Sequence, residues 1–213
     1  MKIILLGPPG AGKGTQAEIL SKKLNLNTIS TGVMLRTAIR EKTKLGEIAA
    51  QYINDGKLVP DDDVVGIVKE RLSQPDCENG FILDGFPRTT EQAEALDASG
   101  VQIDKVLSLE VSDETIVERL SGRRECKECG APYHVKFNPS GKGDKCEKCG
   151  GELICRKDDN VDTVKNRIAV YHEKTEPIKS YYENKGLLVT AYGKDKLEDT
   201  TKEVFSALGI EEN

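Results

Sequence analysis

The feature that most constrains the fold is an apolar run followed at once by a glycine-rich loop. Residues 1–6 read MKIILL and residues 7–15 read GPPGAGKGT. A short apolar run that ends at glycine and proline predicts a buried strand, and the glycines and lysine that follow have the spacing of a phosphate-binding loop. The common pattern places a hydroxyl residue directly after the lysine. Here Gly14 follows Lys13, and the hydroxyl comes one place later as Thr15.

The physical basis of such a loop is anion binding. Small residues allow successive backbone N–H groups to point at a phosphate, and the helix predicted from Gly12 to Leu24 directs its positive N-terminal end at the same anion. Lys13 supplies a mobile positive charge for the β- and γ-phosphates, and Thr15 can reach a phosphate or Mg²⁺. The alternative is a plain turn, but a strand before it and a helix after it favour a nucleotide site.

The rest of the chain alternates between strand-like and helical patterns. Strands are predicted at residues 2–6, 26–30, 80–85, 105–111 and 186–192. Helices are predicted at residues 12–24, 31–41, 43–56, 60–72, 91–100, 112–122, 161–185 and 197–208. Five apolar strands separated by helices predict an α/β fold with a doubly wound five-stranded parallel sheet.

Composition restricts the possible partners. The 213 residues carry a net charge of −5, so the chain has no bulk attraction for nucleic acid or an anionic membrane. No apolar run approaches the roughly 20 residues that span a bilayer. Gly7 and the two prolines end the first apolar run too early for a signal-peptide layout, so we expect a cytoplasmic protein. In that compartment its six cysteines indicate metal binding or chemistry rather than disulfides.

Residues 123–159 interrupt the alternation of strands and helices. This segment is poor in aliphatic residues and contains two Cys-x-x-Cys pairs, Cys126 with Cys129 and Cys146 with Cys149. Their spacing is typical of a zinc site, and four thiolates leave no open position, so the metal is expected to be structural. A redox pair and a coincidental spacing are the alternatives. The two remaining cysteines, Cys77 and Cys155, are expected to be ordinary small side chains.

Two further motifs follow predicted strands. STGVMLR, residues 30–36, lies beyond the second strand, and LDGFPRT, residues 83–89, ends the third. Ligands bind at the carboxyl ends of the strands in such sheets. Asp84 can hold Mg²⁺ through water, and Arg36 and Arg88 can clamp a second phosphate. A turn around Asp84 and a solvated charge at Arg36 are the alternatives, which the shared position beside one loop disfavours.

Together these motifs resemble the adenylate kinase family. The resemblance rests on GPPGAGKGTQ, STGVMLR, GKLVPD, LDGFPRT, Gln92, VERLSGRR, CRKDDN and Arg167, and it runs from Met1 to about Leu208. It implies a P-loop kinase that transfers the terminal phosphoryl group of MgATP to AMP, giving two ADP. It also implies a monomer that binds ATP, AMP and ADP but neither nucleic acid nor membrane. The implied domains are a core (1–29, 60–121 and 160–213), a helical AMP-binding arm (30–59) and a zinc-binding lid (122–159).

The resemblance also implies the residues of the site. ATP is expected to contact Gly10, Ala11, Gly12, Lys13, Gly14, Thr15, Arg119, Arg123, Pro132, Tyr133 and Asp195. AMP is expected to contact Thr31, Arg36, Lys57, Leu58, Val59, Gly85, Phe86, Pro87, Arg88, Gln92, Arg156 and Arg167. Catalytic charge is expected from Lys13, Arg88, Arg123, Arg156 and Arg167, with Mg²⁺ held through water by Asp84 and Zn²⁺ by Cys126, Cys129, Cys146 and Cys149.

Alternatives to this function remain. The family usually has aspartate at the position of Val33, so no polar role is assigned there. A kinase of GMP, UMP or CMP is the closest alternative, although Thr31 and Gln92 favour adenine by resemblance. An ATPase or GTPase would not need the motifs for a second nucleotide. A zinc-ribbon nucleic-acid binder is disfavoured, because residues 123–159 hold nine Lys and Arg against seven Asp and Glu, and four thiolates with Zn²⁺ reduce that +2 to about zero.

Overall fold

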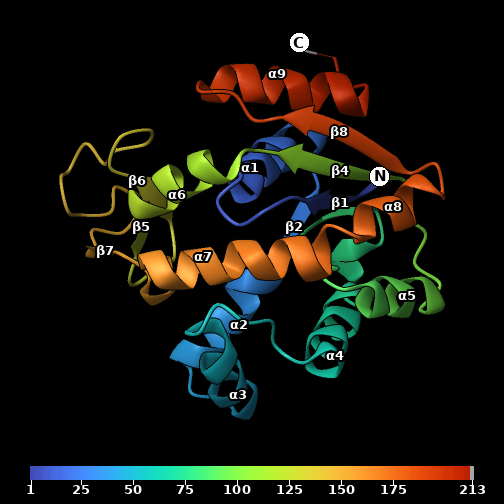
Figure 1. Cartoon of the computed structure of the whole chain (residues 1–213), viewed down its shortest axis with the longest axis horizontal. Helices are drawn as coiled ribbons and strands as arrows, with labels where there is room; N and C mark the ends of the chain where they lie inside the picture. Colours follow the sequence, from blue (N-terminus) through green and yellow to red (C-terminus); the bar gives the residue numbers. More distant parts are fainter. Residues whose placement is uncertain (212–213) are drawn as a thin grey trace.

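A five-stranded parallel sheet forms the centre of the molecule. The computed structural model describes residues 1–211 and orders the strands β2-β3-β1-β4-β8 (Figure 1). The strands are β1 (Lys2–Leu6), β2 (Asn27–Ser30), β3 (Phe81–Asp84), β4 (Lys105–Glu110) and β8 (Leu188–Tyr192). The predicted α/β fold with a parallel sheet is therefore confirmed. Leu5 of β1 is in register with Asp84 of β3, which places the two loops that follow these strands side by side.

Helices cover both faces of the sheet because successive side chains of β1 point in opposite directions. Ile3 and Leu5 pack in one core with α1 and α9, whereas Ile4 and Leu6 pack in a second core with α4, α5 and α8. The helices are α1 (Lys13–Leu24), α4 (Asp61–Leu72), α5 (Thr90–Ala98), α8 (Ile178–Glu183) and α9 (Leu197–Leu208). Residues 1–211 also contain three short 3₁₀ or π segments: η1 (Pro75–Cys77), η2 (Lys157–Asp159) and η3 (Tyr171–Thr175). No helix of residues 1–211 is both long and apolar enough to cross a membrane.

A pair of helices, α2 (Thr31–Arg40) and α3 (Lys44–Ile53), projects from the sheet and is called the helical arm (Figure 1). The two helices pack closely through Gly46, since a Cβ there would lie 2.1 Å from the carbonyl oxygen of Ala38. The arm returns to the body beside α7 (Val161–Val170). There Asn166 donates to the carbonyl oxygen of Asp55 at 2.6 Å. Both predicted helices of the arm are confirmed.

The inserted segment, residues 123–159, follows α6 (Asp113–Ser121) and lies beyond the end of the sheet (Figure 1). It forms a second, antiparallel sheet with the order β6-β5-β7. Its strands are β5 (Arg123–Cys126), β6 (Pro132–His134) and β7 (Leu153–Ile154). Its buried cluster consists of Cys126, Ala131, Tyr133 and Cys146. As expected, the segment contains no long helix.

One predicted element is wrong. The sequence predicts a single helix over residues 161–185, but α7 ends at Val170 and is followed by the π-helical η3 and then α8. The cause is Pro177, which lacks an N–H and whose ring would clash with a carbonyl of the preceding α-helical turn. The backbone widens before it, and Glu176 donates to the carbonyl oxygen of Tyr171, five residues back, at 2.8 Å.

Candidate active site

The glycine-rich loop joins β1 to α1 with its backbone donors directed at the cleft. Gly12 is the N-cap of α1 with φ of 103°, a left-handed conformation that favours glycine. Because glycine has no side chain, no capping group occupies the N–H groups at the start of the helix. The first N–H groups of α1 are therefore available to an anion. Lys13 folds back across the loop, where its ammonium donates to the carbonyl oxygens of Gly7 at 2.6 Å and Pro8 at 2.8 Å.

A carboxylate lies beside this loop. An oxygen of Asp84 accepts a hydrogen bond from the Ser30 hydroxyl at 3.3 Å, and it would lie 3.7 Å from a Cβ at Gly14. Burial lowers the pKa of Lys13 to about 8; Asp84 opposes the change, whereas the cations of Arg88 and two further arginines, Arg167 and Arg123, add to it. The predicted Mg²⁺ carboxylate and four of the predicted catalytic cations thus surround one loop.

Two carboxylates hold the arginines that face the loop. Arg123 donates through Nε to Asp159 at 2.7 Å, and Arg167 donates to Asp159 at 2.9 Å and pairs with Asp158 at 2.9 Å. Burial alone would raise the pKa of Asp158, but four arginines hold it below its usual value, the strongest being Arg167 and Arg123. The sequence alone does not predict this role for either aspartate, although both belong to the CRKDDN motif.

The helical arm and the inserted segment meet across the cleft. Glu125 of β5 accepts a hydrogen bond from Arg156 and pairs with Arg36 of α2 at 3.8 Å. Burial and the Arg156 cation lower the pKa of Arg36 to about 10, while Glu125 opposes them. The Nε of Arg156 is buried and has no hydrogen-bond partner among residues 1–211. A second contact joins Arg40 to the carbonyl oxygen of Glu128 at 3.3 Å.

Arg119, on α6, connects the glycine-rich loop to the loop that follows β8. It donates to the carbonyl oxygen of Ala11 at 3.0 Å and to that of Lys194 at 2.9 Å. Asp195 follows Lys194 and is exposed. The structure thus brings Arg119, predicted to stack on the ATP adenine, next to both the phosphate loop and the segment around Asp195.

Several of the predicted AMP residues also meet. Thr31 of α2 and the Nε of Arg88 both donate to the carbonyl oxygen of Gly85 at 2.8 Å. The backbone N–H of Arg88 donates to the side-chain oxygen of Gln92 at 2.8 Å. Phe86 and Pro87 are buried. Of the other predicted AMP residues, Val59 is buried, Leu58 is partly buried and Lys57 is exposed. Thr31, Gly85, Arg88 and Gln92 therefore form one connected group at the base of the arm.

The four predicted zinc ligands converge in the inserted segment. The sulfur atoms of Cys126, Cys129, Cys146 and Cys149 all lie within 4.8 Å of one another, with two pairs at 3.4 and 3.6 Å. Four sulfurs about 2.3 Å from one Zn²⁺ would lie about 3.8 Å apart, so the donor set and its spacing fit this metal. No cysteine of residues 1–211 forms a disulfide, and Cys77 and Cys155 lie outside the cluster.

Tyr133 supports this cluster from inside the inserted segment. Its hydroxyl lies 3.4 Å from the sulfur of Cys146 and accepts a hydrogen bond from the N–H of Glu147 at 2.8 Å. That hydroxyl is the largest influence lowering the pKa of Cys146 to about 6. The side chain of Tyr133 is buried, whereas Pro132 is exposed. Contact of these two residues with ATP stays a prediction.

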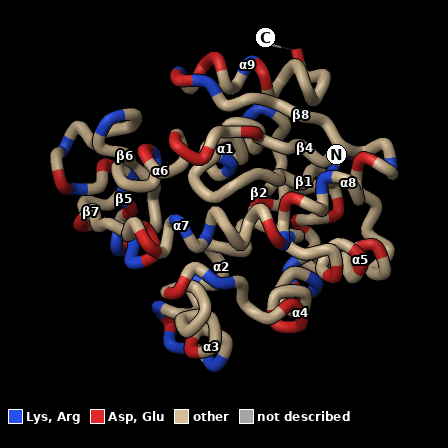
Figure 2. The backbone as a smooth tube through the Cα atoms, in the orientation of Figure 1, with Lys and Arg blue, Asp and Glu red and all other residues tan. Residues whose placement is uncertain are grey.

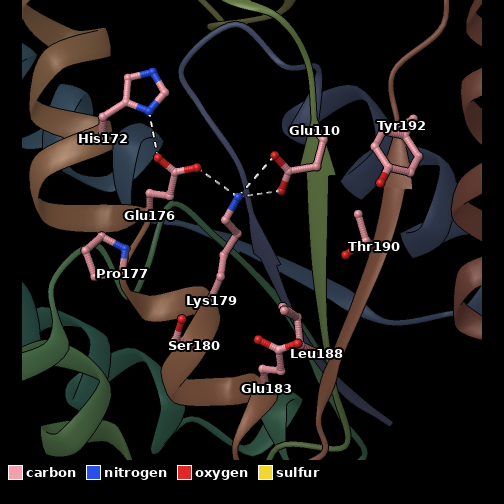
Figure 3. Close-up of a pocket in the computed structure, with 10 residues that line it drawn as sticks. All are labelled: Glu110, His172, Glu176, Pro177, Lys179, Ser180, Glu183, Leu188, Thr190 and Tyr192. Atoms are coloured by element: carbon pink, nitrogen blue, oxygen red, sulfur yellow. Dashed lines mark hydrogen bonds and ion pairs between the residues drawn. The ribbon is translucent and has the colours of Figure 1, made fainter.

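A pocket of about 640 Å³ lies elsewhere, between η3, α8 and the edge strand β8, and contains none of the predicted site residues. Figure 3 shows Lys179 at its centre, where the ammonium pairs with Glu110 at 3.1 Å and Glu176 at 3.1 Å. His172 shares a further hydrogen bond with Glu176 at 2.8 Å. Two carboxylates already neutralise the lysine, so this pocket is not suited to a nucleotide phosphate.

The distribution of charge over the inserted segment tests the alternative that the protein is a zinc-ribbon nucleic-acid binder. Figure 2 shows basic and acidic residues interspersed over the inserted segment rather than gathered by sign. A polyanion binder would present a basic face or stripe. The mixed charges along the segment therefore give no support to a zinc-ribbon nucleic-acid binder.

Comparison with known proteins agrees with the geometry of the cleft. The family model described as adenylate kinase matches residues 5–187. Adenylate kinase from Caldicellulosiruptor bescii is 58% identical over 99% of this chain and 100% of its own length. The enzyme of the same name from Archaeoglobus fulgidus is 51% identical over 98% of each chain. The match covers the phosphate loop, the arm, the inserted segment and most of the sheet, and the chain belongs to the adenylate kinase family.

Proposed function

We propose that this protein catalyses the reaction of its family at the cleft around Lys13: MgATP and AMP react reversibly to give two ADP. The observation that carries the proposal is the convergence of separate charges on the glycine-rich loop. Asp84, Arg88, Arg123 and Arg167 come from different parts of the chain, and each lies close enough to Lys13 to shift its pKa. A single-nucleotide ATPase would not need the arm-side group at Gly85, Arg88 and Gln92.

ATP is proposed to occupy the side of the cleft next to α1. Its phosphates would accept hydrogen bonds from the N–H groups of residues 10–15 and from Lys13, with Thr15 at the start of α1. Arg119 would cover the adenine near Asp195, since it already connects the two loops there. Pro132 and Tyr133 would approach from the inserted segment.

AMP is proposed to occupy the side next to the helical arm. Arg88, which is exposed, and Arg36 would bind its phosphate, with Arg156 and Arg167 between the two nucleotides. The buried Nε of Arg156 has no partner among the described residues, as expected of a donor that a phosphate would engage. The base would lie at Thr31 and Gln92, enclosed by residues 57–59 and 85–87.

The chemistry that follows is mainly positioning. An oxygen of the AMP phosphate attacks the γ-phosphorus of ATP, and the bond from that phosphorus to the ADP oxygen breaks. The attacking group is already an anion, so no general base is required. Lys13 and the arginines stabilise charge on the transferring group, and closure of the arm and the inserted segment excludes water. Mg²⁺, which the family uses with ATP, would be held through water by Asp84 and would neutralise phosphate charge.

The inserted segment is proposed to bind one structural Zn²⁺ through its four clustered cysteines. We further propose that residues 122–159 act as a lid and residues 30–59 as an AMP-binding arm on a core of residues 1–29, 60–121 and 160–213. The protein is proposed to be a cytoplasmic monomer. Light scattering on the purified chain checks the mass in solution.

A coupled assay tests the proposal. Purified protein is supplied with MgATP and each of AMP, GMP, UMP and CMP, and metal content is measured on the same sample. We expect ADP formation with AMP far above the other three, no turnover without a monophosphate, and one zinc per chain. Equal rates with all four monophosphates would instead identify a broad nucleoside monophosphate kinase, and turnover of ATP alone would identify an ATPase.

A further inference from the structure

A carboxylate outside the predicted site residues contacts Gln92. Asp61, in the first turn of α4, accepts a hydrogen bond from the side-chain nitrogen of Gln92 at 2.7 Å. Its second oxygen accepts from the hydroxyl of Thr89 at 2.9 Å. Thr89 is the N-cap of α5 and in turn accepts from the backbone N–H of Gln92 at 3.2 Å. Asp61 therefore joins the start of α4 to the first turn of α5, which carries Gln92.

The side-chain amide of Gln92 is held at both ends. Its nitrogen donates to Asp61, and its oxygen accepts from the backbone N–H of Arg88 at 2.8 Å. An ionised carboxylate only accepts and a backbone N–H only donates. Turning the amide over would bring two oxygens together at Asp61 and two donors together at Arg88. Gln92 is 1% exposed, so water cannot compensate for such a mismatch.

The fixed amide keeps one N–H and one oxygen lone pair for a ligand. The Watson–Crick edge of adenine offers N1 as an acceptor and the N6 amino group as a donor, which complements that pair. Hypoxanthine and guanine carry the opposite arrangement, an N1–H donor and an O6 acceptor. An amide free to turn over could pair with either kind of base, whereas an amide fixed in one orientation rejects one of them.

We propose that Asp61 is a positioning residue that fixes the Gln92 amide in the orientation that pairs with adenine. The inference rests on the proposed function, in which Gln92 contacts the base of AMP. It assigns part of the discrimination between 6-amino and 6-oxo purines to a residue that does not touch the nucleotide. Because Gln92 is buried, the groups that cover it must move before the base can enter.

A purely structural role for Asp61 is the competing explanation. Asp61, Asp62 and Asp63 all lie in the first turn of α4, where acidic side chains stabilise the positive end of a helix. Asp62 is exposed and provides the matched control, since it carries the same charge on the same turn. The substitution Asp61→Asn removes the charge but keeps an acceptor for Gln92. The oxygen of the new asparagine can accept from Gln92, while its NH₂ group donates to the Thr89 hydroxyl, which can act as an acceptor.

The experiment measures kcat/KM for AMP and for inosine monophosphate in the wild type and in Asp61→Ala, Asp61→Asn and Asp62→Ala. Inosine monophosphate changes the base edge without adding the 2-amino group of guanine. We expect the AMP preference of Asp61→Ala to fall about tenfold or more, through a higher KM for AMP with the KM for ATP unchanged. Asp61→Asn and Asp62→Ala should keep the wild-type preference within about threefold. Thermal unfolding verifies that each variant is folded.

Two results would overturn the inference. One is a folded Asp61→Ala variant with the wild-type preference. The other is an equal loss of preference in Asp61→Asn, which would implicate the charge rather than the acceptor. Failure of the proposed function is distinguishable, because the wild type itself would then show no preference for AMP over inosine monophosphate.

Discussion

The central sheet and the inserted segment are stabilised by different means. Ile3, Ile4 and Ile82 of the sheet are 0% exposed and lie in cores that also contain the covering helices. In the inserted segment Val135 is 56% exposed and Ile154 is 37% exposed, and the buried cluster is built around two of the four clustered cysteines. Burial of apolar surface can account for the stability of the first region but not for that of the second, whose shape we propose to be held by the metal at its four cysteines.

Loss of the metal should give the largest effect and should be confined to one region. Chelation or Cys146→Ala is expected to unfold residues 123–155, because zinc contributes about 10 kcal/mol or more to folding in small zinc peptides. Hydrogen exchange should show rapid exchange at the N–H groups of Cys126 and Gly130, which are hydrogen-bonded within the segment, while the sheet stays protected. Cys155→Ala, at an exposed cysteine outside the cluster, should change nothing. Full protection in the metal-free protein would contradict the comparison.

Loss of the loop cation should affect catalysis and leave both regions folded. Lys13→Ala removes the ammonium over the phosphate loop, and we expect kcat to fall by about 10²–10³. The thermal unfolding midpoints of the sheet and of the inserted segment should stay close to those of the wild type. Lys179→Ala is the control, because Lys179 is a paired lysine of the other pocket, and its turnover should stay within about threefold. Near-normal turnover in a folded Lys13→Ala variant would contradict the assignment of this loop as the ATP phosphate site.

Truncation of a side chain in the sheet should destabilise the sheet, whereas loss of the metal should destabilise the inserted segment. Ile82→Ala leaves a cavity in a fully buried position and should reduce the free energy of unfolding by about 3 kcal/mol. Val135→Ala, at an exposed position of the inserted segment, should change it by less than about 0.5 kcal/mol. Urea titrations followed by circular dichroism measure both. Equal losses would mean that the two regions share one core.

Features set by neighbouring residues could be predicted from the sequence. The order of apolar strand, glycine loop and helix around Lys13 is local, so the sequence alone is enough to locate the loop. The two Cys-x-x-Cys pairs place their thiolates by local turns, and the four sulfurs do converge. The π-helical η3 could not be predicted in the same way, because the apolar periodicity of α7 continues through it and only Pro177 signals the interruption.

Features set by distant residues could not be predicted. Asp61 contacts Gln92 across 31 positions of sequence, and its acidic neighbours indicate only a helix start. The pairing of Asp159 with Arg123 is equally hidden, since the two are joined only when the inserted segment folds back to α7. The first pair depends on how α4 packs against α5, and the second on how the inserted segment packs against the body. No local sequence pattern predicts either packing.

The smallest expected effect is a dependence of ATP affinity on pH. The pKa of Lys13 in the free protein is about 8, below the usual lysine value of 10.5, chiefly because of burial. A phosphate beside the ammonium stabilises the charged form, so binding takes up a proton wherever the free lysine is neutral. Affinity should therefore be constant between about pH 7, where the terminal phosphate of ATP is already ionised, and pH 8. Above pH 8 it should weaken up to tenfold per pH unit, about 1.4 kcal/mol. Calorimetric titration with ATP measures the slope, and Lys13→Arg, which stays charged, should flatten it. Lys13 belongs to the sheet region, so the same slope should persist in metal-free protein; its disappearance there would show that the inserted segment supports the phosphate loop.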